Sequence, residues 1–300
     1  MLVLIYGITG MVGQPTARAA LAAGHQVRGL GRNPQKLHED IAGAMESFVK
    51  IRDAYDIPAY DEAVAGVDAI ISAPSGAFET ALDGQILLLR AAERAGIKIF
   101  HASSWNYDWT RLLLGFHEGY DPLLSFWNHA RLSSTIKPIA TFTGTIPDYV
   151  FYSSTLNNPF NTKTLAFSYF GTGNEIDIFT TVDDIAAYAI AAISEPTAAE
   201  GGIRYVESFR ASMLQLADAY EDVHSVQLKR KNLGDVDEVD RRLKEGRAKT
   251  HPANYNDYSC YIYLQIHLKG LCLHDSVDSK RWGHVKQTSL KDWLKAHPDI

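Results

Sequence analysis

The chain has 300 residues, of which 46% are hydrophobic, enough for one large core or for one domain with a smaller lobe attached. Its formal net charge of −6 offers no basic surface for nucleic acid or anionic lipid. No stretch approaches the roughly 20 apolar residues that cross a bilayer. We therefore expect neither nucleic acid nor a membrane as a partner.

Signals for export and for metal binding are weak. The apolar run 2–6 is too short for a signal peptide, and the two cysteines, Cys260 and Cys272, lie late in the chain. The eleven histidines are scattered rather than spaced as metal ligands. We expect a cytoplasmic protein with reduced thiols and no metal site.

Residues 1–104 alternate short apolar runs with helical patterns. Strands are predicted at 2–6, 25–31, 47–51, 67–75 and 97–104. Helices are predicted at 14–24, 33–43, 57–66 and 80–96, the first with Pro15 at its start and Gly24 at its end. Strands that alternate with helices in this way form a parallel sheet with right-handed crossovers. The pattern predicts an α/β protein with a Rossmann-type, doubly wound parallel sheet.

The regular alternation of predicted strands and helices ends after residue 104. An aromatic loop is expected at 105–121, followed by a helix at 122–134, a strand at 137–144, a helix at 181–196 and a strand at 201–208. The remainder, with helices near 210–223 and 235–247, is expected to form a smaller, mostly helical lobe that covers the cleft. We assign 1–150 to the nucleotide-binding domain and 151–300 to the substrate-side lobe, with 165–208 returning a strand–helix–strand unit to the first domain.

Three glycines mark the turn between the first strand and the first helix. Gly7, Gly10 and Gly13 form G-x-x-G-x-x-G, with Thr9, Met11 and Val12 between them. Such glycines allow a sharp turn, close approach of a pyrophosphate to the backbone, and tight packing of helix on strand. The helix N-terminus would attract the phosphates. The motif and its context predict a dinucleotide-binding site.

The residues after the second strand indicate which dinucleotide binds. NAD is recognised by a carboxylate there, whereas an arginine suits the 2′-phosphate of NADP. The sequence offers Arg32 and Lys36 and no acidic residue before Glu39, so we predict NADP(H). By their positions after later strands, Asp53 is assigned to the adenine side. Ala73, Pro74 and Ser75 are assigned to the ribose and nicotinamide side.

Taken together, "IYGITGMVG", "GRNPQKL", "VDAIISAPS", "TVDDIAAYAI" and "QTSLKDWLK" resemble an NmrA-like, isoflavone-reductase-like atypical short-chain dehydrogenase/reductase. The resemblance spans nearly the whole chain. It implies an NADPH-preferring Rossmann domain with the phosphates at Gly7 to Gly13 and the 2′-phosphate at Arg32. The group includes reductases of small aromatic or alkaloid-type metabolites and also regulators that sense the cofactor.

The chain departs from such enzymes at the proton donor. Typical short-chain dehydrogenases use Tyr-x-x-x-Lys, but here Tyr120 is followed by Leu124 and Tyr107 by Arg111. Reductases of the NmrA-like group often carry a lysine early in the helix after the fifth strand, and the helix at 122–134 has none. A substrate that arrives as a cation, such as an iminium, needs hydride only, and for it the missing acid is harmless.

Several residues are candidates for the chemistry. Ser103 or Ser104 matches the position from which the family's serine polarises a carbonyl, and His129 is a candidate proton donor because histidine is the side chain that most often exchanges protons near neutral pH. Tyr107 and Tyr120 are candidates for hydrogen bonds to substrate. Candidates for the substrate-binding wall are Trp105, Trp109 and Tyr149, although the alternating aromatics at 105–109 suit core packing equally well.

The sequence favours an NADPH-dependent reductase of secondary-metabolite type. It would transfer hydride to a C=O, C=N or conjugated C=C of a moderately large apolar or aromatic small molecule. Two alternatives stay open: an NADP(H)-binding sensor without turnover, and an enzyme of Rossmann fold that catalyses a redox-neutral condensation or cyclisation.

Overall fold

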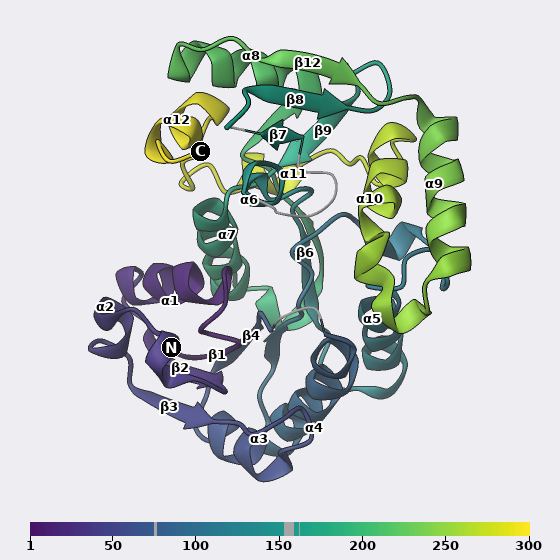
Figure 1. The fold of residues 1–300 in the computed structure, drawn as a ribbon. Coiled ribbons are helices and arrows are strands. Elements are labelled where there is room, and N and C mark those ends of the chain that lie inside the picture. The colour runs from purple at the N-terminus through teal and green to yellow at the C-terminus, as the bar shows by residue number, and fades with distance from the viewer. Residues whose placement is uncertain (75–76, 153–158, 162) are drawn as a thin grey trace.

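A central parallel sheet organises the protein (Figure 1). The computed structural model describes residues 1–74, 77–152, 159–161 and 163–300. The sheet has seven strands in the order β10-β6-β5-β4-β1-β2-β3, and every neighbouring pair is parallel. Its strands are β1 (Leu2–Tyr6), β2 (Gln26–Gly31), β3 (Ser47–Lys50), β4 (Ala69–Ser72), β5 (Ile99–His101), β6 (Ile139–Phe142) and β10 (Gly202–Tyr205). The predicted Rossmann-type sheet is confirmed.

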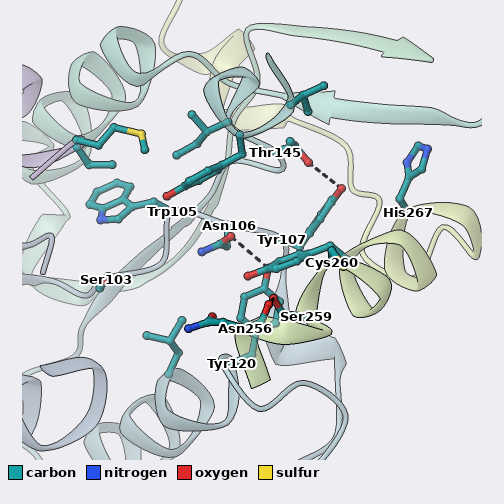
Figure 2. A pocket seen from close by; sticks show the side chains of 18 of the residues that line it. Ser103, Trp105, Asn106, Tyr107, Tyr120, Thr145, Asn256, Ser259, Cys260 and His267 are labelled. Atoms are coloured by element: carbon teal, nitrogen blue, oxygen red, sulfur yellow. Dashed lines mark hydrogen bonds between the residues drawn. The ribbon is translucent and has the colours of Figure 1, made fainter. Parts of the chain in front are cut away.

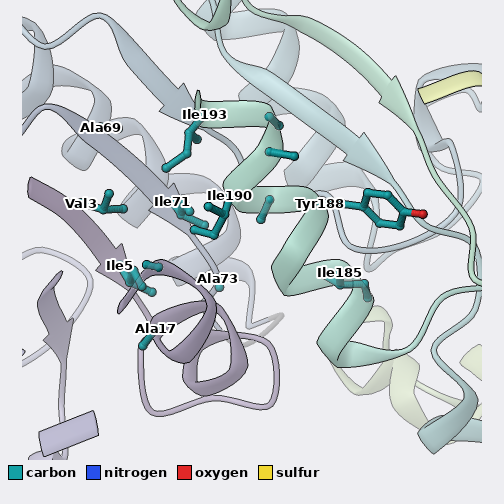
Figure 3. Close-up of a cluster of buried hydrophobic side chains, with 14 of the residues drawn as sticks. Val3, Ile5, Ala17, Ala69, Ile71, Ala73, Ile185, Tyr188, Ile190 and Ile193 are labelled. Carbon is teal, nitrogen blue, oxygen red and sulfur yellow. The ribbon is translucent and has the colours of Figure 1, made fainter. Parts of the chain in front are cut away.

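Helices cover both faces of this sheet, as the alternation of side chains along β1 requires. Val3 and Ile5 belong to a core with α1 and α7, whereas Leu4 and Tyr6 belong to a core with α3, α4 and α5. Figure 3 shows the first of these cores. The helices are α1 (Gly13–Ala22), α3 (Ile57–Val64), α4 (Gln85–Ala95), α5 (Asp121–Ser133) and α7 (Val182–Ser194).

The predicted helix at 33–43 is shorter than expected. A 3₁₀ turn at Pro34–Lys36 is separated from α2 (Glu39–Ala42) by Leu37 and His38, whose backbones are extended. The aromatic loop holds one 3₁₀ turn, Trp109–Arg111. α6 (Pro147–Phe151) follows β6.

The C-terminal part contains more strand than we expected. The strands form two small sheets, β7-β8-β12 and β9-β11. They are β7 (Phe160–Asn161), β8 (Ala166–Tyr169), β9 (Ile176–Phe179), β11 (Phe209–Ser212) and β12 (Lys229–Asn232). The helices are α8 (Met213–His224), α9 (Val236–Lys249), α10 (Ser259–Leu268), α11 (Val277–Arg281) and α12 (Leu290–Ala296). None of the helices in the described ranges has the length and apolar character of a membrane-spanning segment.

Candidate functional site

The turn after β1 is built on close backbone contact. Gly7 has a φ of +77°, and a Cβ there would lie 2.4 Å from the carbonyl oxygen of Ala73, just after β4. A Cβ on Gly13 would lie 2.3 Å from the carbonyl oxygen of Gly7. Both approaches are too short for a side chain, so these glycines allow β1, α1 and the segment after β4 to meet. Because β1 is flanked by β2 and β4, this is where strand order reverses and ligands bind in such sheets.

The N-terminus of α1 is free to hold an anion. Within the described residues, the backbone N–H groups of Met11 and Val12 have no hydrogen-bond acceptor. Gly10, Met11 and Val12 line a cavity. Because residue 10 is glycine, no side chain covers the backbone at that position. Free N–H groups and the helix dipole together favour negative charge. The residues present therefore fit the pyrophosphate of a dinucleotide.

The predicted specificity residues lie beside this turn. Arg32 follows β2 directly, is exposed, and has no hydrogen-bond or ion-pair partner among the described residues. Burial raises the pKa of Tyr6 at the end of β1, and the positive charge of Arg32 partly offsets that rise. Lys36 and Asp53 are also exposed, and an Asp53 carboxylate oxygen accepts from the N–H of Tyr55 (2.8 Å). Arg32 and Lys36 are therefore available to a phosphate.

A cavity of about 620 Å³ runs from this turn to α10. Of the residues assigned to the nicotinamide side, Ala73 and Pro74 line it, and Ser75 lies outside the described residues. Figure 2 shows Ser103 and Trp105 on one side of the pocket and His267 on the other. The walls include Trp105, Asn106, Tyr107, Tyr120, Thr145, Tyr149, Asp177, Asn256, Ser259, Cys260, Tyr263 and His267.

Five of the residues predicted for catalysis or substrate binding also line this cavity: Ser103, Trp105, Tyr107, Tyr120 and Tyr149. Trp105 is fixed by its indole N–H, which donates to the carbonyl of Ser72 (3.2 Å), and by stacking on His101. The Tyr120 hydroxyl donates to Asn106 Oδ1 (3.2 Å). Burial raises the pKa of both Tyr107 and Tyr120 well above the usual value, so both phenols keep their protons.

A polar cluster at the far end of the cavity was not predicted. The hydroxyl of Tyr107 donates to Asp177 Oδ2 at 2.5 Å. The Thr145 hydroxyl lies 2.8 Å from that phenolic oxygen and 3.0 Å from Asp177 Oδ2. His267 Nδ1 lies 3.6 Å from the same carboxylate oxygen. The four residues of this cluster come from four separate segments: the loop after β5, the segment after β6, strand β9 and helix α10. No local sequence motif could therefore predict the cluster.

Three of the residues predicted for catalysis or substrate binding, Ser104, Trp109 and His129, do not line this cavity. Ser104 is fully buried; its Oγ accepts from the N–H of Thr141 (2.7 Å) and donates to the carbonyl of Ala102. Trp109 is fully buried and packs edge-on against Trp127 and Phe142.

His129 is kept out of the cavity by the direction in which its side chain points. Its Nε2 lies 2.8 Å from Arg90 Nη2, so the ring faces α4, and it is not among the residues that line the cavity. A single histidine on a helix gives no sequence signal for the face it occupies. His129 is therefore not placed to donate a proton to a ligand in this cavity.

The sheet and the glycine turn are those of a Rossmann-type dinucleotide-binding domain. Comparison with known proteins agrees, because residues 7–111 match the NAD(P)H-binding family. The matched segment begins at the glycine turn and ends in the aromatic loop. The predicted dinucleotide-binding domain is therefore confirmed.

One relative is described as an oxidoreductase. Over 77 residues the chain is 42% identical to a Schizosaccharomyces pombe protein described as an uncharacterized oxidoreductase, a match that covers 24% of this chain and 23% of that protein. The chain thus matches about a quarter of that relative's length.

Solved structures match the whole chain. Vitis vinifera leucoanthocyanidin reductase with NADPH has a TM-score of 0.81 at 19% identity, with both chains covered completely. An isoflavone reductase has a TM-score of 0.79 at 18% identity over 98% of both chains. AtPrR2 with NADP⁺ and (+)-pinoresinol has a TM-score of 0.78 at 21% identity over 98% of this chain and 97% of that one. The resemblance to isoflavone-reductase-like proteins is confirmed in the fold and in the NAD(P)H-binding domain.

Proposed function

We propose that the protein is an NADPH-dependent reductase that transfers hydride to a C=O, C=N or conjugated C=C of a moderately large, apolar or aromatic small molecule. The observation that carries this proposal is the continuous cavity that joins the free terminus of α1 to an aromatic wall. A ligand-sized, largely apolar cavity with a few polar groups is typical of a substrate site. The relatives with bound NADPH or NADP⁺ support the choice of cofactor.

In this proposal each half of the chain has its own task. Residues 1–150 hold the nucleotide and supply one wall of the cavity, including Ser103 and Trp105, and residues 151–300 supply the opposite side, with α7 and β10 packing on and joining the Rossmann sheet. Met11 and Val12 would bind the pyrophosphate through their N–H groups, and Arg32 with Lys36 would bind the 2′-phosphate. Bound NADPH supplies the hydride.

The cavity residues then position the acceptor and exclude water. Trp105 is held rigidly by its hydrogen bond and by stacking, so it offers a fixed apolar wall near Ser103. Ser103 is placed to hydrogen-bond a substrate oxygen or nitrogen, because it lines the cavity while its own N–H donates to Gln85 Oε1 (2.8 Å). A fixed wall and a directed hydroxyl are what orientation of a hydride acceptor requires.

Parallel measurement of NADPH consumption and product formation tests the proposal. Aromatic ketones, enones and iminium salts would be supplied, with loss of absorbance at 340 nm compared with product formed. Equal loss and formation supports the reductase. Conversion without loss of NADPH overturns it in favour of redox-neutral chemistry, and tight nucleotide binding without turnover of any compound overturns it in favour of a sensor. His129→Gln, outside the cavity, serves as the control variant and keeps the wild-type rate.

A further inference from the structure

The charged side chains that line the cavity favour a cationic ligand over an anionic one. Among the described residues that line it, Asp177 is the only carboxylate, and there is no lysine or arginine. One basic side chain, His267, also lines this end, and it makes no hydrogen bond to Asp177. A ligand that enters the cavity therefore meets one acidic group and no permanently cationic side chain.

Asp177 is held in place but is not matched by a permanent cation. The residue is 5% exposed, on β9. Its Oδ2 accepts from the Tyr107 hydroxyl, with the Thr145 hydroxyl at 3.0 Å, and its Oδ1 accepts from the N–H of Ile178 (2.8 Å). These neutral donors orient the carboxylate without cancelling a formal charge. Charges buried in proteins are ordinarily paired. Among the described cavity residues, the one basic group beside Asp177 is the His267 imidazole at 3.6 Å, beyond hydrogen-bond distance and positive only when protonated, so a cationic ligand would supply the permanent positive charge that this carboxylate lacks as a partner.

The rest of the wall favours the same kind of ligand. Five tyrosines line the cavity: Tyr107, Tyr120, Tyr149, Tyr255 and Tyr263. Tyrosine rings attract organic cations through the negative potential of the ring face, and this attraction strengthens when the cation is desolvated. A carboxylate among several tyrosines is a suitable environment for a nitrogen cation and an unfavourable one for an anion.

We infer that the substrate is an organic iminium cation, with Asp177 as its counter-ion. This inference rests on the proposed function and selects C=N⁺ among the acceptors named there. Hydride from NADPH adds to the iminium carbon, the π pair of C=N becomes a lone pair on nitrogen, and NADPH leaves as NADP⁺. The positive charge of the iminium is lost as the positive charge of NADP⁺ appears, so the total charge is unchanged, and no proton is consumed. The step therefore requires no Tyr-Lys pair and no lysine on α5, which the chain lacks.

A matched pair of probes tests the inference: 2-methyl-3,4-dihydroisoquinolinium, an iminium, and 2-tetralone, a neutral ketone of the same bicyclic size. Dissociation constants are measured by calorimetry on the protein with NADP⁺, where no hydride is available. The wild type is expected to bind the iminium at least about tenfold more tightly than the ketone, the scale of one charge-assisted contact with cation–π support. Equal binding, preference for the ketone, or no binding of either probe would overturn the inference.

Variants test whether Asp177 causes the preference for the iminium over the ketone. Asp177→Asn keeps the size of the side chain and an oxygen to accept from Tyr107, and it is expected to abolish the preference while ketone binding is unchanged. The surface control Asp222→Asn, which replaces an exposed carboxylate paired with Lys291, is expected to keep it. Retention of the preference in a folded Asp177→Asn protein would overturn the assignment of the counter-ion, and the wild-type comparison decides the inference should that variant not fold.

Turnover separates this inference from the function on which it rests. With NADPH, the iminium is expected to be reduced and the ketone left unreacted. Faster reduction of the ketone overturns the inference and leaves the reductase standing. A tenfold binding preference without hydride transfer to any acceptor upholds the cation site and overturns the reductase.

Discussion

Replacement of Arg32 by alanine tests how the protein distinguishes NADPH from NADH. Hydrogen bonds to charged groups contribute about 1.5–3 kcal/mol. Arg32 is exposed, so solvent screening reduces its contribution to about 1–2 kcal/mol. This corresponds to a loss of about 5- to 30-fold in affinity for NADPH. NADH, which lacks the 2′-phosphate, is expected to bind as tightly to the variant as to the wild type.

The assay is calorimetric titration of wild type and variant with both nucleotides at low and at moderate salt. The NADPH difference should shrink as salt increases, because screening weakens contacts between exposed charges. Arg94→Ala is the matched control: Arg94 is an exposed arginine near the C-terminal end of α4, just before β5 begins, and is paired with Asp61 of α3, whereas Arg32 follows the end of β2. Equal weakening of NADPH and NADH in Arg32→Ala, or an unchanged affinity for NADPH, would refute the reasoning.

Two further predictions concern stability. A Cβ added at Gly13 meets backbone atoms that cannot move aside, so Gly13→Ala should lower the free energy of unfolding by about 1–3 kcal/mol. At Gly283 the nearest atom to an added Cβ lies at 3.8 Å, so the control Gly283→Ala should change that free energy by less than about 0.5 kcal/mol. Urea unfolding measures both. Burial lowers the pKa of His101, His117 and His274 to about 4, from 6.5. Between these values the unfolded chain binds protons that the folded chain does not, so stability should fall as pH drops from 6.5 towards 4, by up to about 1.4 kcal/mol per pH unit for each histidine. Urea midpoints that stay constant from pH 7 to pH 4.5 would contradict this.

The nucleotide end of the site could be predicted because its signals are local. The three glycines, Arg32 and the alternation of strands and helices each act through neighbours in sequence, and the turn lies where this pattern puts it. The parallel sheet could be predicted too, because alternating strands and helices are joined by right-handed crossovers between parallel strands.

The substrate end could not be predicted in the same way. Tyr107, Thr145, Asp177 and His267 come together only through the packing of four separate segments. The sequence predicted a strand between residue 165 and the helix at 181–196 and assigned it to the main sheet. That assignment was wrong, because β9, which carries Asp177, pairs with β11 outside the main sheet.

Neighbouring candidates were also separated by backbone geometry rather than by residue type. Ser103 and Ser104 are chemically identical, but only Ser103 lines the cavity, while Ser104 binds the backbone of β6. Adjacent side chains on extended backbone point to opposite sides, so a boundary error of one residue exchanges their roles.

The structure of the NADP⁺ complex is the most direct test of the central claim, that a nucleotide held at the first helix faces a substrate cavity. The account predicts the pyrophosphate within hydrogen-bond distance of the N–H groups of Met11 and Val12, the 2′-phosphate beside Arg32, and the nicotinamide in the cavity next to Trp105. A nucleotide bound elsewhere, or a nicotinamide ring turned out of the cavity, would contradict it.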